Sequence, residues 1–134
     1  MIGLFFSTNC MTIPPLSISA LIQQKSLCIM PVRCPFPTNY IKLVSEEEWN
    51  HAATFANENR RATYLAGRLA MRTLLMPHLN QLPQEIPLFT EPSGAPAILS
   101  APHLYVSVTH TVSETAAVFA SAPVGIDLEH IQKR

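Results

Sequence analysis

Two carboxylates stand one residue apart close to the end of this 134-residue chain, in the segment GIDLE, as Asp127 and Glu129. If the segment is a strand, alternation puts both carboxylates on one face, while Ile126 and Leu128 are buried on the other. A pair of this kind suits Mg²⁺, which takes few protein oxygens and keeps water or substrate phosphate in its other positions. General acid–base catalysis and a solvated edge strand with two acids are the alternative interpretations.

A histidine lies at the end of another predicted strand, HLYVSVTHT, as His110 between Thr109 and Thr111. A histidine between two hydroxyls at a strand end can donate a hydrogen bond to phosphate or act as a base. A surface histidine in a turn is the alternative. Alternation along this strand separates two sets of side chains, Leu104, Val106 and Val108 on one face and Tyr105, Ser107 and Thr109 on the other.

Three arginines share one side of the predicted helix RRATYLAGRLAMRTLLM. At 100° per residue, Arg61, Arg68 and Arg72 fall within about 40° of one another. Guanidinium groups match phosphate oxygens in a two-pronged hydrogen-bonding geometry, so the stripe could hold phosphates. A solvated helix face is the alternative. Gly67 costs this helix about 1 kcal/mol relative to alanine, which predicts a close approach to a sheet or a ligand there.

The elements that must position these residues follow from local signals. Ser26–Val32 reads as a strand with Pro31 at an edge position, and Ser45 with Glu48 forms a capping box that begins a helix of about three turns. Asn57 to Asn59 mark a break before the long helix, which should end at Pro77. Five short strands then follow, IPLFT, PAIL, HLYVSVTHT, TAAVFA and GIDLE, with EPSGAP as a turn. The pattern predicts an α+β fold, an antiparallel sheet packed against a long helix.

Composition restricts the class of protein. With 48% hydrophobic and 13% charged residues, the chain can bury one core and is not a disordered segment. A formal net charge of zero gives no support to nucleic-acid binding. Three cysteines without CxxC spacing argue against a disulfide framework or a zinc site, and favour reduced thiols in the cytoplasm.

Residues 1–25 are expected to form a poorly ordered leader. The leader is apolar, but it lacks a positively charged start, and Pro14 and Pro15 interrupt its apolar run well short of a membrane span. A signal peptide and a membrane anchor are therefore not expected. The ordered domain is predicted to cover residues 26–134.

The segments RRATYLAGRLAMRTLL, FTEPSGAPAIL, YVSVTHT and VGIDLE occur in an order that resembles the N-terminal half of the Sfp-type 4′-phosphopantetheinyl transferases. The resemblance covers about residues 41–132. It implies one half of a pseudo-twofold fold, and an enzyme that moves the phosphopantetheine arm of coenzyme A onto a serine of an acyl or peptidyl carrier protein. Siderophore-synthase activators and broad-specificity carrier-protein activators are similar.

The resemblance also implies roles for single residues. Asp127 and Glu129 match the acids that hold Mg²⁺ at the coenzyme A diphosphate. The family's S-H-S motif corresponds to Thr109, His110 and Thr111, which would contact the phosphates. The remaining residues expected to bind coenzyme A are Arg61, Arg68, Gly94 and Pro96.

Two departures from the family pattern modify these expectations. Ala95 stands where the family's turn has a lysine that reaches the 3′-phosphate, so weaker coenzyme A binding is expected. The W-x-x-K-E-A helix of the second half, which supplies a metal-binding glutamate and the lysine implicated in the chemistry, is not found in the sequence. No catalytic residue is therefore assigned, and the chain alone is expected to be weak or inactive.

Two other classes of function remain open. The chain could be a non-catalytic half-domain that pairs with itself or with a separately encoded second half, through the edge and face that a second half normally covers. A metal-dependent phosphohydrolase would use the same two acids, but the sequence offers no further Asp/His cluster after them.

Overall fold

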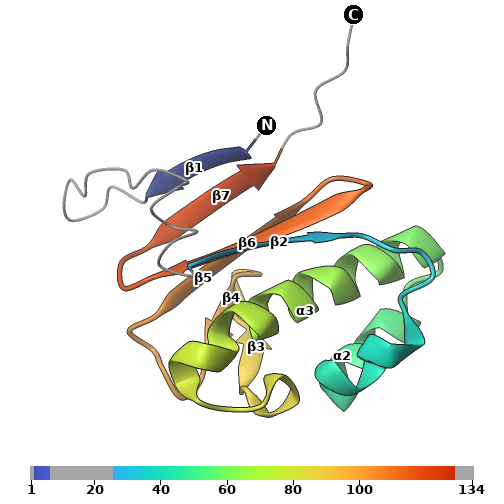
Figure 1. Ribbon diagram of the computed structural model, residues 1–134, viewed down its shortest axis with the longest axis horizontal. Coiled ribbons are helices and arrows are strands. Elements are labelled where there is room, and N and C mark those ends of the chain that lie inside the picture. The colour runs from blue at the N-terminus through green and yellow to red at the C-terminus, as the bar shows by residue number, and fades with distance from the viewer. Residues whose placement is uncertain (1, 7–25, 129–134) are drawn as a thin grey trace, which may run out of the picture.

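The fold was analysed in a computed structural model, which describes residues 2–6 and 26–128. A three-stranded antiparallel sheet packs against one long helix (Figure 1). The helices are α2 (Glu46–Ala53) and α3 (Glu58–Leu79), with 3₁₀ turns at Thr38–Leu43 and Pro83–Glu85. The strands are β1 (Ile2–Phe6), β2 (Leu27–Pro31), β3 (Leu88–Thr90), β4 (Pro96–Ile98), β5 (Tyr105–His110), β6 (Glu114–Ala120) and β7 (Val124–Leu128).

Helix α2 begins at the predicted capping box. The Ser45 Oγ accepts a hydrogen bond from the Glu48 main-chain N at 3.1 Å, and the Ser45 N donates to Glu48 Oε1 at 3.0 Å. These two bonds satisfy main-chain donors that a helix start leaves without partners. The helix has eight residues, about two turns rather than the predicted three, and ends at Ala53, with Thr54 as the C-cap residue.

Helix α3 starts where the sequence predicted a break, because Asn57 caps it by accepting from the Arg60 N at 3.1 Å. The prediction that Pro77 ends the helix is wrong, since the helix continues to Leu79. Pro77 falls in the last turn, where the lost hydrogen bond and the crowding by its ring affect only the end of the helix. Asn80 ends the helix instead, in the left-handed region at φ 50°.

Strand β6 is the centre of the sheet, with β2 and β5 paired antiparallel on its two sides. Pro31 therefore lies in an edge strand, as predicted. The two faces of β6 are both buried. Ala117 and Phe119 belong to the core shared with α3, whereas Ala116 and Val118 pack with Ile126 of β7. The buried Ile126 agrees with the predicted burial of that face of GIDLE.

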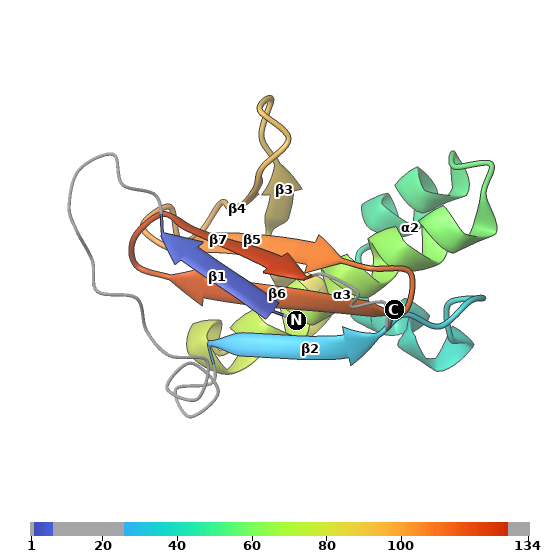
Figure 2. The same ribbon diagram turned by 90° about the horizontal axis from the view of Figure 1, so that it is seen from above.

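Strands β7 and β1 form a second layer on the sheet face opposite α3 (Figures 1 and 2). They pair antiparallel along their whole length, from Ile2 opposite Leu128 to Phe6 opposite Val124. The sequence analysis placed residues 1–25 in a poorly ordered leader and expected no strand there. The strand at Ile2–Phe6 differs from that expectation, and it follows from the main-chain groups that an edge of β7 offers for pairing. Residues 7–25 lie outside the described residues.

The hairpin of β3 and β4 is a separate two-stranded sheet beside α3, and its turn is the predicted EPSGAP segment. The turn closes through the Gly94 N, which donates to the Glu91 O at 2.8 Å, and the Glu91 N, which donates to the Ala95 O at 2.8 Å. Gly94 has φ 92°, a conformation that glycine adopts without strain.

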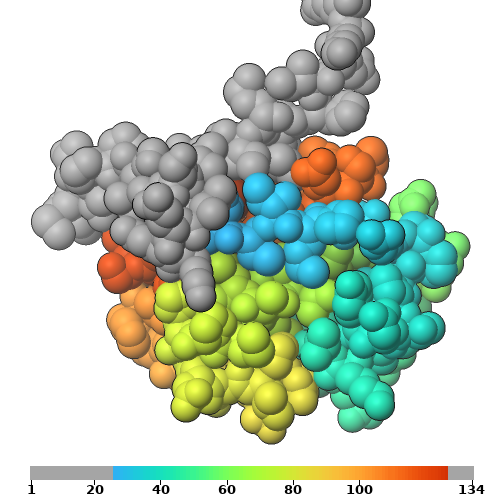
Figure 3. Space-filling model, in the orientation of Figure 1, coloured from blue at the N-terminus to red at the C-terminus, as the bar shows by residue number. Residues whose placement is uncertain are grey.

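On the face drawn in Figure 3, α2, the C-terminal end of α3 and β2 lie next to one another at the surface. None of the helices among the described residues is long and apolar enough to cross a membrane.

Candidate functional site

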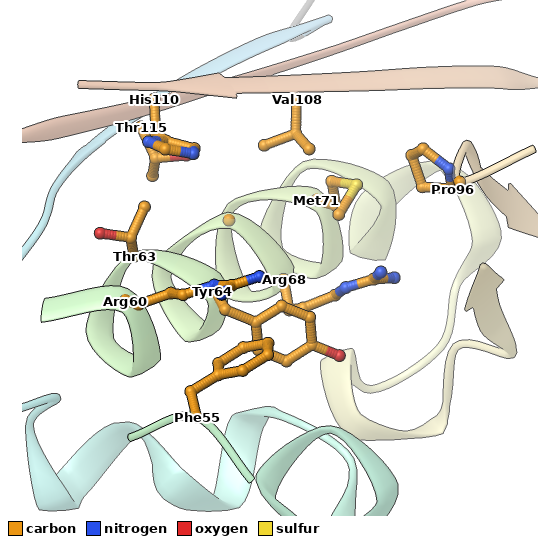
Figure 4. Close-up of a pocket in the computed structure, with 12 residues that line it drawn as sticks. Phe55, Arg60, Thr63, Tyr64, Arg68, Met71, Pro96, Val108, His110 and Thr115 are labelled. Atoms are coloured by element: carbon orange, nitrogen blue, oxygen red, sulfur yellow. The ribbon is translucent and has the colours of Figure 1, made fainter. Parts of the chain in front are cut away.

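A pocket of about 440 Å³ lies between α3 and the helix-facing side of the sheet (Figure 4). Four of the residues that the sequence analysis expected to bind coenzyme A line this pocket, namely Arg68, Gly94, Pro96 and His110. They come from α3, the turn after β3, the start of β4 and the end of β5. The fold therefore brings together residues that are up to 42 positions apart in the chain.

Strand alternation explains why His110 enters the pocket. Val108 and His110, two residues apart on β5, both line it, and His110 is exposed. Thr115 of β6 lies opposite His110 in the sheet and lines the same pocket, although it is fully buried. Figure 4 shows these three side chains extending from the sheet toward α3. Only the register of the β5–β6 hairpin identifies Thr115, and the sequence analysis missed it.

The two threonines beside His110 do not line the pocket. Thr109 alternates to the other face of β5, and its main-chain O accepts a hydrogen bond from the Thr115 Oγ1 at 3.0 Å. Thr111 begins the turn into β6, where its Oγ1 accepts from the Glu114 N at 3.2 Å. Of the predicted group Thr109, His110 and Thr111, only His110 therefore lines the pocket.

Arg68 is held from three sides. Its Nη2 donates to the Thr90 Oγ1 at 2.6 Å, and its Nε lies 3.8 Å from Glu48 Oε2. Its guanidinium carbon is 5.2 Å from the centre of the Tyr64 ring, within the range of a cation–π contact. Arg68 therefore has a defined position at the wall of the pocket.

Arg72 does not belong to a ligand-binding stripe, which corrects the sequence analysis. The residue is 1% exposed, its Nε donates to Glu48 Oε1 at 2.7 Å, and its Nη1 donates to the main-chain O atoms of Pro83 and Ile86 at 2.8 and 2.7 Å. At Arg72 the side of α3 that was predicted to hold phosphates faces the interior of the protein, toward α2 and the 3₁₀ turn before β3. Arg72 therefore connects buried elements and is not accessible to a ligand.

Arg61 lies at a different pocket, of about 220 Å³, together with Trp49 and Phe36. Its Nη2 donates to the Ala56 O at 3.3 Å. Its neighbour Arg60 lines the larger pocket instead, with its guanidinium carbon 4.5 Å from the centre of the Phe55 ring.

The spacing of residues along α3 would have indicated that Arg60 lines the pocket. Arg60, Tyr64, Gly67 and Met71 follow at intervals of four, three and four residues, which is one side of a helix, and all four line the pocket. Arg60 was not among the residues expected at a site, because the expected stripe contained arginines alone.

Aromatic rings form the wall of the pocket beside the arginines. The centroids of Phe55 and Tyr64 are 5.6 Å apart, and His51 lies 5.1 Å from each of them. Burial raises the pKa of the Tyr64 phenol above its usual value of 10.0, and the charge of Arg68 opposes the rise. Tyr64 is therefore neutral at pH 7 and can donate a hydrogen bond.

Among the described residues, the lining of the pocket includes two arginines and a histidine but no aspartate or glutamate. Guanidinium groups bind phosphate and carboxylate oxygens through paired hydrogen bonds, and an imidazole can add a donor. The aromatic wall offers a flat apolar surface. This combination suits an organic anion, such as a phosphorylated compound with an apolar or aromatic part.

The predicted metal ligands are placed only in part. Asp127 lies in β7, with its main chain opposite Gly3, and Glu129 lies outside the described residues. Strands β5 and β7 run in the same direction in Figure 2, so their C-terminal ends point toward the same side of the molecule. Within residues 2–6 and 26–128, no group of three or more His, Cys, Asp and Glu side chains could hold a metal ion.

Comparison with known proteins rests on structure. No protein-family model and no curated protein sequence matches the chain. Among solved structures, the chain is similar to a holo-(acyl-carrier-protein) synthase from Bacillus anthracis str. Ames in complex with CoA (3′,5′-ADP). The TM-score is 0.52 at 16% sequence identity, over 70% of this chain and 92% of that one. The similarity shows the fold, and it confirms the predicted α+β class with an antiparallel sheet and a long helix.

Proposed function

We propose that the chain is a 4′-phosphopantetheinyl transferase, which moves the phosphopantetheine arm of coenzyme A to a serine of an acyl or peptidyl carrier protein. The observation that carries the proposal is the pocket of arginine, histidine and aromatic residues, free of carboxylates among the described residues, on the fold of a holo-(acyl-carrier-protein) synthase bound to CoA. The residue motifs that resemble the Sfp-type enzymes support the same class. The Sfp type and a cytoplasmic location are part of the proposal.

In this proposal the phosphates of coenzyme A bind at Arg60, Arg68 and His110, which line the same pocket from α3 and from the end of β5. Gly94 and Pro96 shape its rim, because a turn without a large side chain leaves room for the ligand. Arg61, Thr109 and Thr111 are left out of this binding set, since they do not line the pocket.

Asp127 and Glu129 are proposed to hold Mg²⁺, because paired carboxylates supply the oxygen ligands that this ion prefers. When bound, the ion would neutralise charge on the diphosphate. Weak transfer by these 134 residues alone is also part of the proposal, since the Sfp-type enzymes that the sequence resembles take further catalytic groups from a second half.

The binding part of the proposal is tested by calorimetric titration of the chain with 3′,5′-ADP and with coenzyme A. Arg60→Ala and Arg68→Ala should each weaken binding by roughly tenfold, the loss of about 1.4 kcal/mol that a charge-assisted hydrogen bond contributes. Arg61→Ala is the matched control, because Arg61 is adjacent in sequence but lies at another pocket. If Arg61→Ala weakens binding as much as Arg60→Ala, the pocket is not the binding site.

Transfer is tested by incubating the chain with coenzyme A, Mg²⁺ and an apo-carrier protein, and measuring the mass increase of the carrier. A small or absent increase, together with binding of coenzyme A, is the expected result. Rapid turnover by the chain alone would contradict the expected need for a second half. Absence of coenzyme A binding would contradict the proposed function itself.

A further inference from the structure

We infer that Thr90 is a positioning residue, which sets the orientation of Arg68 in the pocket and thereby the affinity for an anionic ligand. The inference rests on the proposed function only for the identity of that ligand. Thr90 itself does not line the pocket, but its Oγ1 accepts the Arg68 Nη2–H at 2.6 Å. Thr90 is the last residue of β3, so the contact joins the β3–β4 hairpin to α3.

The hydrogen bond to Thr90 matters because, at 2.6 Å, it is shorter than the contact of Arg68 with Glu48. Glu48 Oε2 lies 3.8 Å from the Arg68 Nε, too far for a hydrogen bond, and this oxygen has no hydrogen-bond partner among the described residues. The Tyr64 ring lies 5.2 Å from the guanidinium carbon, and Arg68 also interacts with the Tyr64 hydroxyl through a side-chain hydrogen bond, which opposes the rise that burial causes in the Tyr64 pKa. Thr90 therefore holds the Nη2–H group from the side of the β3–β4 hairpin, whereas the other contacts of Arg68 come from α2 and α3.

Glu48 holds its own position through other partners. Its Oε1 accepts from the Arg72 Nε at 2.7 Å and from the Ser45 N at 3.0 Å. One carboxylate thus neutralises the buried Arg72, and the positive charge of Arg68 remains beside the pocket. A neutral hydroxyl can orient this charge without reducing it, whereas a second carboxylate in place of Thr90 would oppose the binding of an anion.

Thr90 lies next to the turn that forms the rim of the pocket, so the same hairpin supplies Gly94, Pro96 and the orienting hydroxyl. A displacement of the hairpin would change the rim and the orientation of Arg68 together. The hairpin is therefore proposed to act as one unit in ligand binding.

The test compares the intact chain with Thr90→Val and Thr90→Ser, using 3′,5′-ADP as the probe in calorimetric titration. Thr90→Val keeps the shape of the side chain and the charge of the pocket but removes the acceptor, and should weaken binding by roughly five- to tenfold. Thr90→Ser keeps the acceptor and should stay within about twofold of the unchanged chain. Thr73→Val is the matched control, since Thr73 is exposed on α3 and does not line the pocket.

A double-mutant cycle separates positioning from a general loss of structure. If Thr90 acts through Arg68, Thr90→Val should add no further loss in the Arg68→Ala background. Equal affinity of Thr90→Val and the unchanged chain, or a loss that adds to that of Arg68→Ala, would overturn the inference. Melting temperatures of the Thr90 variants should agree with that of the unchanged chain within a few degrees, because Thr90 is exposed.

A measurement without ligand keeps the inference testable if the chain binds no 3′,5′-ADP. The ¹⁵N relaxation of the Arg68 Nε–H group, assigned with Arg68→Lys, should report an ordered guanidinium in the unchanged chain and in Thr90→Ser. It should report a mobile one in Thr90→Val. The same order in all three would overturn the positioning role, whereas a missing response to 3′,5′-ADP alone would contradict only the proposed function.

Discussion

At the scale of single residues, Arg68 and Arg72 have different roles although they lie only about 40° apart around α3, because each meets different neighbours along the length of the helix. Arg60 and Arg68 line the pocket, whereas Arg72 is buried in an ion pair with Glu48. A buried ion pair is a weak source of net stability, but breaking it leaves one charge without compensation. Residue type alone therefore could not separate the arginines that line the pocket from the buried one.

Arg72→Met should lower the free energy of unfolding by about 3–5 kcal/mol, because Glu48 then remains buried without its closest counter-charge. Urea denaturation measures the change. The double variant Glu48→Gln with Arg72→Met is the control, and it should recover a large part of the loss, since glutamine can still reach the Ser45 main chain. A loss below about 1 kcal/mol in Arg72→Met would contradict the structural role of this pair.

At the scale of elements, the side of α3 that carries Gly67 approaches the sheet closely. A Cβ atom at Gly67 would lie 3.3 Å from the Val108 Cγ2 and 3.7 Å from the Thr115 Oγ1. The first distance is shorter than ordinary van der Waals contact between carbon atoms. The sequence analysis predicted such an approach from a glycine within a helix, and the geometry identifies the sheet as the neighbour.

Gly67→Ala should therefore stabilise the chain by less than the roughly 1 kcal/mol that alanine gains over glycine in a helix. In a Val108→Ala background, where the crowding methyl is absent, the full gain should appear. Urea denaturation of the four chains measures the coupling between the two sites. An equal gain in both backgrounds would show that the helix and sheet are not in close contact there.

Elements were largely predictable from sequence, whereas the lining of the pocket was predictable only in part, since Arg68 and His110 were expected there but Arg60 and Thr115 were not. The capping box of Ser45 and Glu48, the break at Asn57 and the strands after α3 depend on local signals, which a sequence displays directly. The pairing of His110 with Thr115 depends on hairpin register, and the place of Arg60 depends on the rotation of α3 against the sheet. Both are decided by packing between distant segments.

At the scale of the whole molecule, the first and last described strands meet, because β1 pairs with β7 along five residues of each. The pairing gives β7 a partner on an edge that would otherwise present free main-chain N–H and C=O groups. Strand β7 also packs through Ile126 against the sheet face opposite α3. Strand β1, which precedes β2 in the chain, is therefore paired with the strand that carries Asp127.

Removal of residues 1–25 should accordingly destabilise the chain and promote self-association, because the edge of β7 loses its partner. Urea denaturation should show a lower free energy of unfolding, and sedimentation velocity should show oligomers that increase with concentration. Leu4→Pro in the full chain should produce the same effects, since the fixed φ of proline and its missing N–H both disfavour a place inside a paired strand. Leu4→Val, which keeps the donor, is its control. If the shortened chain has unchanged stability and remains monomeric, the pairing of β1 with β7 contributes little in solution, and residues 26–134 form a sufficient domain.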